Sequence, residues 1–233
     1  VKVSTAVAFT DLQSFNENTG TFKATIDVRL RWEDPRLRQP VVVETDPPKV
    51  YRDAEADAQL AKIWATGVEV INQRDKATYM SQGLRVYPDG RVELTKRMTA
   101  EFAMSYDVSR FPFDRQQLQL DLVIRNQTSN IVAMVFDQDD LDFSRAAANV
   151  KLDGWEVGLV TLRSDTLASW YGFSHAKIAA SLEVARLPGP IVASIFFPLF
   201  ASLVIPVLAI WLNRIQDGRF QIETFELTNL IIG

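Results

Sequence analysis

The residues whose chemistry stands out in this sequence are three closely spaced acids. Asp137, Asp139 and Asp140 lie within the stretch FDQDDLDF, residues 136–143. Carboxylate oxygens at this spacing suit a protonated amine or a divalent cation such as calcium, which prefers oxygen ligands. The alternative is a solvated acidic turn, because aspartate is common in turns for reasons of its own. The stretch is therefore a candidate cation-binding site.

A second candidate site is aromatic. The segment WYGF carries Trp170, Tyr171 and Phe173 outside any strand alternation. Aromatic faces attract cationic amines, although exposed aromatics also serve as ordinary loop anchors. His175 follows closely, and the ordinary pKa of histidine suits a pH switch. The alternative for His175 is a surface residue at the start of a strand.

The composition excludes several classes of chemistry. The chain has no cysteine and one histidine in 233 residues, which excludes disulfides, thiolate metal sites, cysteine nucleophiles and multi-histidine zinc sites. No paired-carboxylate, glycine-rich phosphate loop or nucleophile motif is present, so we expect neither an enzyme nor a required cofactor. The net charge of −4 also speaks against a nucleic-acid partner, which usually needs a basic face.

The elements that must position these residues are mostly strands. The clearest pattern alternates apolar and polar residues from Phe22 to Trp32. A second alternation runs from Ala176 to Val184, and Pro-Asp-Gly at 88–90 marks a hairpin turn. One helical patch is expected at residues 52–64. Several short strands with turn signals are typical of a β-sandwich.

A long apolar run follows the strands. Residues 187–213 contain no charged side chain, and about 20 apolar residues suffice to cross a bilayer as a helix. We therefore expect a membrane helix at about 188–212; the alternative is a buried hairpin of a soluble protein. Pro198 and Pro206 lie inside the run and favour a bundle, because neighbouring helices satisfy the carbonyls that proline leaves free.

The stretch RFPFDRQQLQLDL, residues 110–122, begins as an apolar turn and continues as a strand. Leu118, Leu120 and Leu122 alternate with polar residues, as in a half-buried strand. The turn Phe111–Phe113 is too apolar to be left in solvent and should be covered. Because the strand region leads directly into the apolar run, we expect the outer ends of membrane helices to cover this turn.

These residues resemble the pentameric ligand-gated ion channels, the Cys-loop receptor family. The resemblance covers essentially the whole chain and is carried by Phe111–Asp114, Trp32–Leu37, Trp64–Asn72, Tyr87–Gly90, Arg186 and Pro198. Ala65 stands where the family usually has proline. Met104 and Leu118 stand where animal members place two cysteines, so that disulfide is absent, as it is in bacterial members.

The resemblance implies a prokaryotic channel subunit. An immunoglobulin-like β-sandwich at residues 1–186 would be the extracellular, periplasmic ligand-binding domain. Residues 187–233 would begin an α-helical transmembrane bundle in the bacterial inner membrane, with a pore-lining helix starting at about 219–233 and further helices beyond it. Four identical subunits would complete a homopentamer, opened by a small-molecule or ion ligand at subunit interfaces, with calcium as a candidate modulator.

The resemblance also implies roles for particular residues. Coupling of the sandwich to the pore would involve Arg110, Phe111, Pro112, Phe113, Asp114 and Arg186. We expect an ion pair between Asp114 and Arg186; the alternative is a solvated Asp114 that caps its own turn. Ligand binding would involve Trp170, Tyr171, Phe173, Asp27, Asp139 and Asp140. Asp27 occupies a position that is often aromatic in the family, which argues against the usual neurotransmitters.

Asp217, Glu223 and Glu226 are the candidate pore residues. Glu223 and Glu226 are three residues apart and share a helical face. In five subunits such acids would form negatively charged rings that attract monovalent cations. The alternative is that they only begin a helix, whose N-terminal dipole favours acids. The competing function is a membrane-anchored β-sandwich for binding or adhesion, which leaves the apolar turn and the two glutamates unexplained.

Overall fold

The computed structural model describes residues 1–40, 46–169 and 171–216. The chain divides into two compact units, Val1–Arg186 and Leu187–Gly233. The elements of the first unit are β1 Lys2–Asn16, β2 Thr21–Glu33, the 3-10 helix η1 Pro35–Leu37, β3 Lys49–Arg52, α1 Asp53–Leu60, β4 Val68–Val70, β5 Thr78–Val86, β6 Arg91–Ala103, β7 Arg115–Ile124, β8 Ala133–Val135, α2 Gln138–Phe143, β9 Trp155–Ala168 and β10 Ser174–Arg186.

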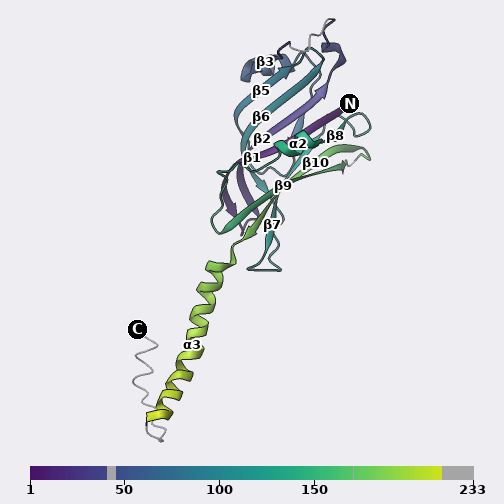
Figure 1. Ribbon diagram of the computed structural model, residues 1–233. Coiled ribbons are helices and arrows are strands. Elements are labelled where there is room, and N and C mark those ends of the chain that lie inside the picture. The colour runs from purple at the N-terminus through teal and green to yellow at the C-terminus, as the bar shows by residue number, and fades with distance from the viewer. Residues whose placement is uncertain (41–45, 170, 217–233) are drawn as a thin grey trace. The chain divides into compact units, whose positions relative to one another are not determined.

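Two sheets make up the first unit, as Figure 1 shows. The larger sheet has the strand order β3-β5-β6-β2-β1-β8, and the smaller has the order β4-β7-β10-β9. β8 runs parallel to β1, whereas the other paired strands in the described residues are antiparallel. The predicted β-sandwich is therefore confirmed.

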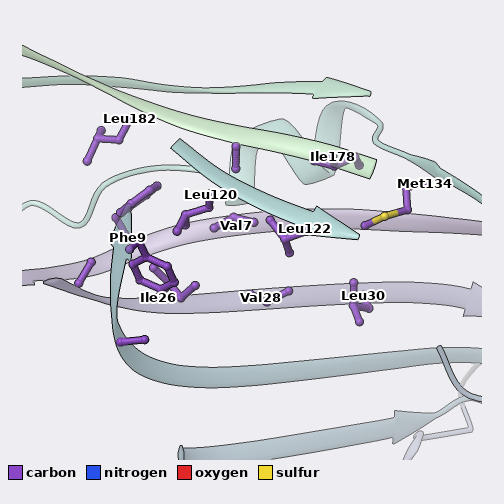
Figure 2. Packing of buried hydrophobic residues seen from close by; sticks show 14 of the residues in the cluster. Val7, Phe9, Ile26, Val28, Leu30, Leu120, Leu122, Met134, Ile178 and Leu182 are labelled. Carbon is purple, nitrogen blue, oxygen red and sulfur yellow. The ribbon is translucent and has the colours of Figure 1, made fainter. Parts of the chain in front are cut away.

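The core lies between the two sheets (Figure 2). The alternation predicted from Phe22 to Trp32 is correct, because every second residue of β2 is at most 3% exposed along that stretch. Leu120 of β7 and Ile178 of β10 face it from the smaller sheet and are fully buried. Each large apolar side chain buried in this way contributes about 1.5–3 kcal/mol, so the alternating pattern selects the face that each strand turns inward.

The helices differ from the sequence-based expectation. The patch at residues 52–64 forms a shorter helix, α1, which ends at Leu60 and buries only Ala56. Ile63 and Trp64 pack against the core from beyond its end, so burial, and not helical periodicity, places them. α2 was not expected; a reciprocal capping box between Asp137 and Asp140 begins it.

The described part of the second unit is a single helix, α3, Pro188–Gln216. Pro198 and Pro206 lie inside it, and the apolar run forms one continuous helix and not a hairpin. Within the described residues, Pro188–Trp211 is the one helix that is long and apolar enough to cross a membrane.

Candidate functional site

Arg186, the last residue of β10, holds together three segments that are distant in sequence. Its Nε donates to Asp114 Oδ1 at 2.7 Å, and its backbone N–H donates to the Asp114 carbonyl oxygen at 3.0 Å. Its Nη1 donates to Glu17 Oε1 at 3.0 Å, and its Nη2 donates to the Tyr106 hydroxyl. We call these four residues the arginine node. The predicted pairing of Asp114 with Arg186 is present.

The arginine node is closed by a second layer of contacts. The Tyr106 hydroxyl donates to Glu17 Oε2 at 2.7 Å, so it accepts from Arg186 and passes a hydrogen bond on to the second carboxylate. Gln116 donates to Asp114 Oδ2 at 2.8 Å. The Arg186 guanidinium carbon lies 4.2 Å from the centre of the Trp155 ring, at cation–π distance.

Burial makes the arginine node intolerant of change. The side chains of Arg186 and Asp114 are 6% and 2% exposed, whereas that of Glu17 is 38% exposed. Removing one partner of a buried pair leaves an uncompensated charge and typically costs about 3–5 kcal/mol. The alternative of a solvated Asp114 is therefore wrong, and Glu17 is the one carboxylate of the node that water reaches readily.

The ionisation of the arginine node follows from these contacts. Burial by itself would raise the pKa of Asp114, but hydrogen bonds from Arg186 and Gln116 outweigh it and hold the pKa below its ordinary value. The hydrogen bond from Arg186 likewise lowers the pKa of Glu17. Burial and the bond to Glu17 raise the pKa of the Tyr106 hydroxyl. The node therefore holds one cation, two carboxylates and a neutral phenol at neutral pH.

The FPFD turn, residues 111–114, is divided between a buried acid and exposed aromatics. Phe111 and Phe113 are 49% and 66% exposed, whereas Asp114 is buried. The Phe113 N–H donates to the Arg110 carbonyl oxygen at 2.7 Å, which closes the turn, and the peptide bond before Pro112 is cis. The predicted coupling residues therefore meet at one end of the sandwich, with two apolar rings on its surface.

The hairpin between β9 and β10 lies at the other end of β10. Thirteen residues of β10 at about 3.3 Å each separate it from Arg186 by about 40 Å. Tyr171 and Phe173 are exposed there, and Trp170 lies outside the described residues. A cavity of about 380 Å³ beneath the hairpin is lined by Arg125, Leu167, Ala168, Ser169, Tyr171 and His175.

Asp27 lies elsewhere, on the outer face of the larger sheet. Arg97 donates to both of its carboxylate oxygens, at 2.7 and 2.6 Å. Asp27 lines a cavity of about 500 Å³ together with Arg52, Arg85 and others. Asp27 and Tyr171 line different cavities, on β2 of the larger sheet and beside β10 of the smaller sheet, so they do not converge within one copy of the chain.

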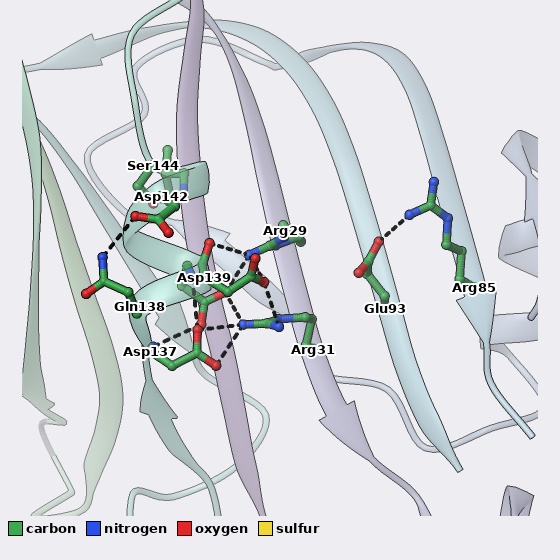
Figure 3. Close-up of polar contacts among 11 residues, drawn as sticks. Arg29, Arg31, Arg85, Glu93, Asp137, Gln138, Asp139, Asp142 and Ser144 are labelled. Atoms are coloured by element: carbon green, nitrogen blue, oxygen red, sulfur yellow. Dashed lines mark hydrogen bonds and ion pairs between the residues drawn. The ribbon is translucent and has the colours of Figure 1, made fainter. Parts of the chain in front are cut away.

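The acidic stretch at α2 pairs with two arginines of β2 (Figure 3). Arg29 contacts Asp139 and Asp140 at 2.9 and 3.0 Å, and Arg31 contacts Asp137, Asp139 and Asp140 at 2.9, 2.8 and 2.7 Å. Asp140 has a fully buried side chain and also accepts from the Asp137 N–H.

The three carboxylates have oxygens within 4.8 Å of one another, as a metal site would need. The guanidinium groups of Arg29 and Arg31 nevertheless already contact these carboxylate oxygens, where a bound ion would have to lie, so this geometry does not fit calcium. The contacts instead fasten α2 to β2, and Ser144 Oγ, which accepts from the Val7 N–H at 3.0 Å, fastens the end of the helix to β1.

Sequence reasoning missed Glu17, Tyr106, Gln116 and the paired arginines of β2. Glu17 is 169 residues from Arg186 along the chain, so no spacing rule could join them. The alternation of β2 did place Arg29 and Arg31 on its outward face, which was a usable signal. The predicted pore residues Asp217, Glu223 and Glu226 lie outside the described residues.

Comparison with known proteins adds independent findings. Residues 1–188 match a family described as the neurotransmitter-gated ion-channel ligand binding domain. The chain is 26% identical over 215 residues to a proton-gated ion channel of Gloeobacter violaceus, which covers 90% of this chain and 56% of that protein. It is 22% identical to gamma-aminobutyric acid receptor subunit theta of Mus musculus, covering 100% of this chain and 35% of that protein.

A further relative, gamma-aminobutyric acid receptor subunit rho-3 of Homo sapiens, is 30% identical over 127 residues, or 52% of this chain and 26% of the relative. The chain therefore spans from about a quarter to somewhat more than half of the length of these relatives.

Proposed function

We propose a function from one premise: this chain belongs to the family of neurotransmitter-gated ion-channel ligand-binding domains. Members of that family are receptors and not enzymes. The proposal is that the chain is part of a subunit of a homopentameric ligand-gated ion channel in a bacterial inner membrane. The β-sandwich is the extracellular domain on the periplasmic side, and α3 is the first membrane helix.

One observation carries this proposal. The family match covers the sandwich, the last strand of the sandwich ends at Arg186, and a helix of membrane-spanning length begins at Pro188. A binding domain joined to its anchor by a flexible linker could not transmit a displacement. Here one intervening residue joins the last strand to the helix, and we propose that movement of β10 is passed on to the start of α3.

The proposed mechanism uses the two ends of β10. Ligand binding at subunit interfaces, beneath the β9–β10 hairpin, displaces the strand. At the other end of β10, Arg186 binds Asp114 of the FPFD turn and Glu17 of the β1–β2 turn. The three segments then move as one body. The exposed rings of Phe111 and Phe113 are proposed to press on the outer ends of the membrane helices.

Selectivity for monovalent cations is the finer part of the proposal. It rests on the acids Asp217, Glu223 and Glu226, because acidic side chains in a membrane-pore segment attract cations and repel anions. In a homopentamer each acid is present five times around the pore. Neutralising Glu223 and Glu226 should therefore weaken the preference for sodium over chloride.

Recording currents from the full-length protein in planar bilayers tests the proposal. The first ligands to apply are protons and γ-aminobutyric acid, which the names of two relatives suggest. Ligand-evoked current that reverses near the sodium potential in a sodium chloride gradient supports a cation channel. A reversal near the chloride potential rejects cation selectivity.

Native mass measurement of the detergent-solubilised protein tests the stoichiometry. Five identical subunits are expected. A monomer that carries no current would reject the channel and leave the membrane-anchored binding module.

The selectivity measurement also needs a control variant. Glu183→Gln in the sandwich is the matched control for Glu223→Gln, because it removes the same charge from a surface pair with Arg115.

A further inference from the structure

The cavity beneath the β9–β10 hairpin has the wrong charge for the amine that its aromatic residues suggest. Arg125 and His175 are the ionisable residues that line it, and in the described residues no carboxylate lines it with them. A cationic ligand would therefore enter a cavity that already holds a guanidinium, which disfavours it electrostatically.

Strand register brings the two basic residues together. β7 and β10 are antiparallel, with Val123 opposite Lys177; two residues further on, the same register brings Arg125 opposite His175. Neighbouring side chains on one face of an antiparallel pair lie about 4.5–5.5 Å apart at Cβ. Arg125 and His175 therefore form one basic edge of the cavity, with the Tyr171 ring as a further wall.

The protonation chemistry of His175 follows from one contact. Its Nδ1 lies 2.8 Å from the carbonyl oxygen of Gln127. A carbonyl oxygen only accepts, so Nδ1 carries the proton of the neutral ring and Nε2 holds the lone pair. A second proton must therefore add at Nε2. The ring is a poor neighbour for an anion when neutral and a donor to it when protonated.

The other charges on this face are already balanced in pairs. Arg125 itself pairs with Glu69 of β4 at 3.2 Å, through Nε. Lys177 of β10 pairs with Asp121 of β7 at 3.0 Å, and Arg163 pairs with Asp165 on β9 at 3.5 Å. Protonation of His175 thus adds one positive charge next to the Arg125 guanidinium, which contacts Glu69 through Nε.

We propose that the cavity lined by Arg125, Tyr171 and His175 binds a small carboxylate anion, and that protonation of His175 strengthens this binding. The inference rests on the proposed function, since it assigns a ligand class to the hairpin site of that channel. The carboxylate pairs with the Nη groups of Arg125 and accepts from His175 Nε2. By linkage, the bound anion favours protonation of His175 by the same coupling free energy by which protonation favours binding.

Titration calorimetry of the detergent-solubilised full-length protein with sodium acetate tests the proposal. Acetate is expected to bind about tenfold more tightly at about pH 5.5 than at about pH 7.5, values on either side of the ordinary histidine pKa, within the usual coupling range of 5- to 150-fold. His175→Gln keeps a donor for the Gln127 carbonyl and should abolish this difference. Arg125→Gln should weaken binding at both pH values.

Arg163→Gln is the matched control, because Arg163 lies on β9 outside the cavity lining; it should bind acetate as the unchanged protein does. Three results would overturn the proposal: equal acetate affinity at both pH values, a pH difference that survives in His175→Gln, or tighter binding of tetramethylammonium than of acetate. These titrations need no membrane current, so a protein that binds acetate without conducting would refute the channel and leave this inference standing.

Discussion

The arginine node offers the sharpest test of how this sandwich is held together. The perturbation is a double-mutant cycle of Asp114→Asn, Arg186→Gln and the combined variant. Both substitutions remove the charge; Asp114→Asn keeps the size of the side chain, whereas Arg186→Gln also shortens it. They separate the energy of the pair from the energy of each residue's other contacts.

The expected magnitudes follow from burial. Arg186→Gln leaves the buried Asp114 carboxylate without its cation, which costs about 3–5 kcal/mol. Asp114→Asn should cost less, because the Arg186 guanidinium keeps Glu17 as a partner. Arg186→Gln should be the more costly, because it also removes the contacts to Glu17 and Tyr106. For a domain of this size about 1 kcal/mol shifts the unfolding midpoint by about 2–4 °C. Arg186→Gln should therefore unfold about 6–20 °C earlier and Asp114→Asn by less, and the double variant should lose less than the sum.

Thermal unfolding of the full-length protein in detergent, at one fixed scan rate, is the assay. Arg115→Gln is the control, because the pair of Arg115 with Glu183 has a similar length of 2.7 Å but an arginine that is 70% exposed. Such surface pairs are worth at most about 1 kcal/mol. The reasoning is refuted if Asp114→Asn and Arg186→Gln add within about 0.5 kcal/mol, or if Arg115→Gln costs as much as either.

The remaining predictions concern the core, α2, the FPFD turn and pH. Leu120→Ala should lower stability by about 2–5 kcal/mol in denaturant unfolding, because the side chain is fully buried; a loss below 1 kcal/mol would contradict the packing. Asp140→Asn should loosen α2 and speed proteolysis near residue 140, since it weakens the contacts of two arginines. Phe113→Ala should leave the unfolding temperature unchanged yet impair ligand-evoked current, whereas Leu159→Ala, at another exposed site, should change neither. Because the pKa of Asp114 is lowered in the folded state, its contribution is present above the ordinary aspartate pKa and is lost as pH falls through the folded value. Stability should therefore drop below about pH 4, and Asp114→Asn should flatten that drop.

Much of the fold could be predicted because it follows from the spacing of apolar residues along short stretches of the chain. The alternation in β2 from Phe22 to Trp32 and the uncharged run of α3 each depend on neighbouring residues only. The ion pair of Asp114 with Arg186 could not be predicted from neighbouring residues alone. Its prediction needed the family resemblance, because the two residues are 72 positions apart.

The helices show where local reasoning was insufficient. The patch at 52–64 contains good helix formers, but only Ala56 faces the core, so little burial stabilises a longer helix. α2 has a capping box that the sequence displays, yet acids in a short polar stretch are equally typical of a turn. Which of the two forms depends on Arg29 and Arg31, which reach it from β2.

The sequence by itself determined the two-layer β architecture, the membrane-length helix and the exclusion of thiol and multi-histidine chemistry. Only the tertiary structure decided which charges meet. It joined Glu17 and Tyr106 to Arg186, filled the acidic stretch with guanidinium groups, and set Arg125 beside His175. The physical reason is that hydrophobic periodicity acts between neighbours in the chain, whereas ion pairing depends on distances of a few ångströms that strand pairing creates between residues far apart in sequence.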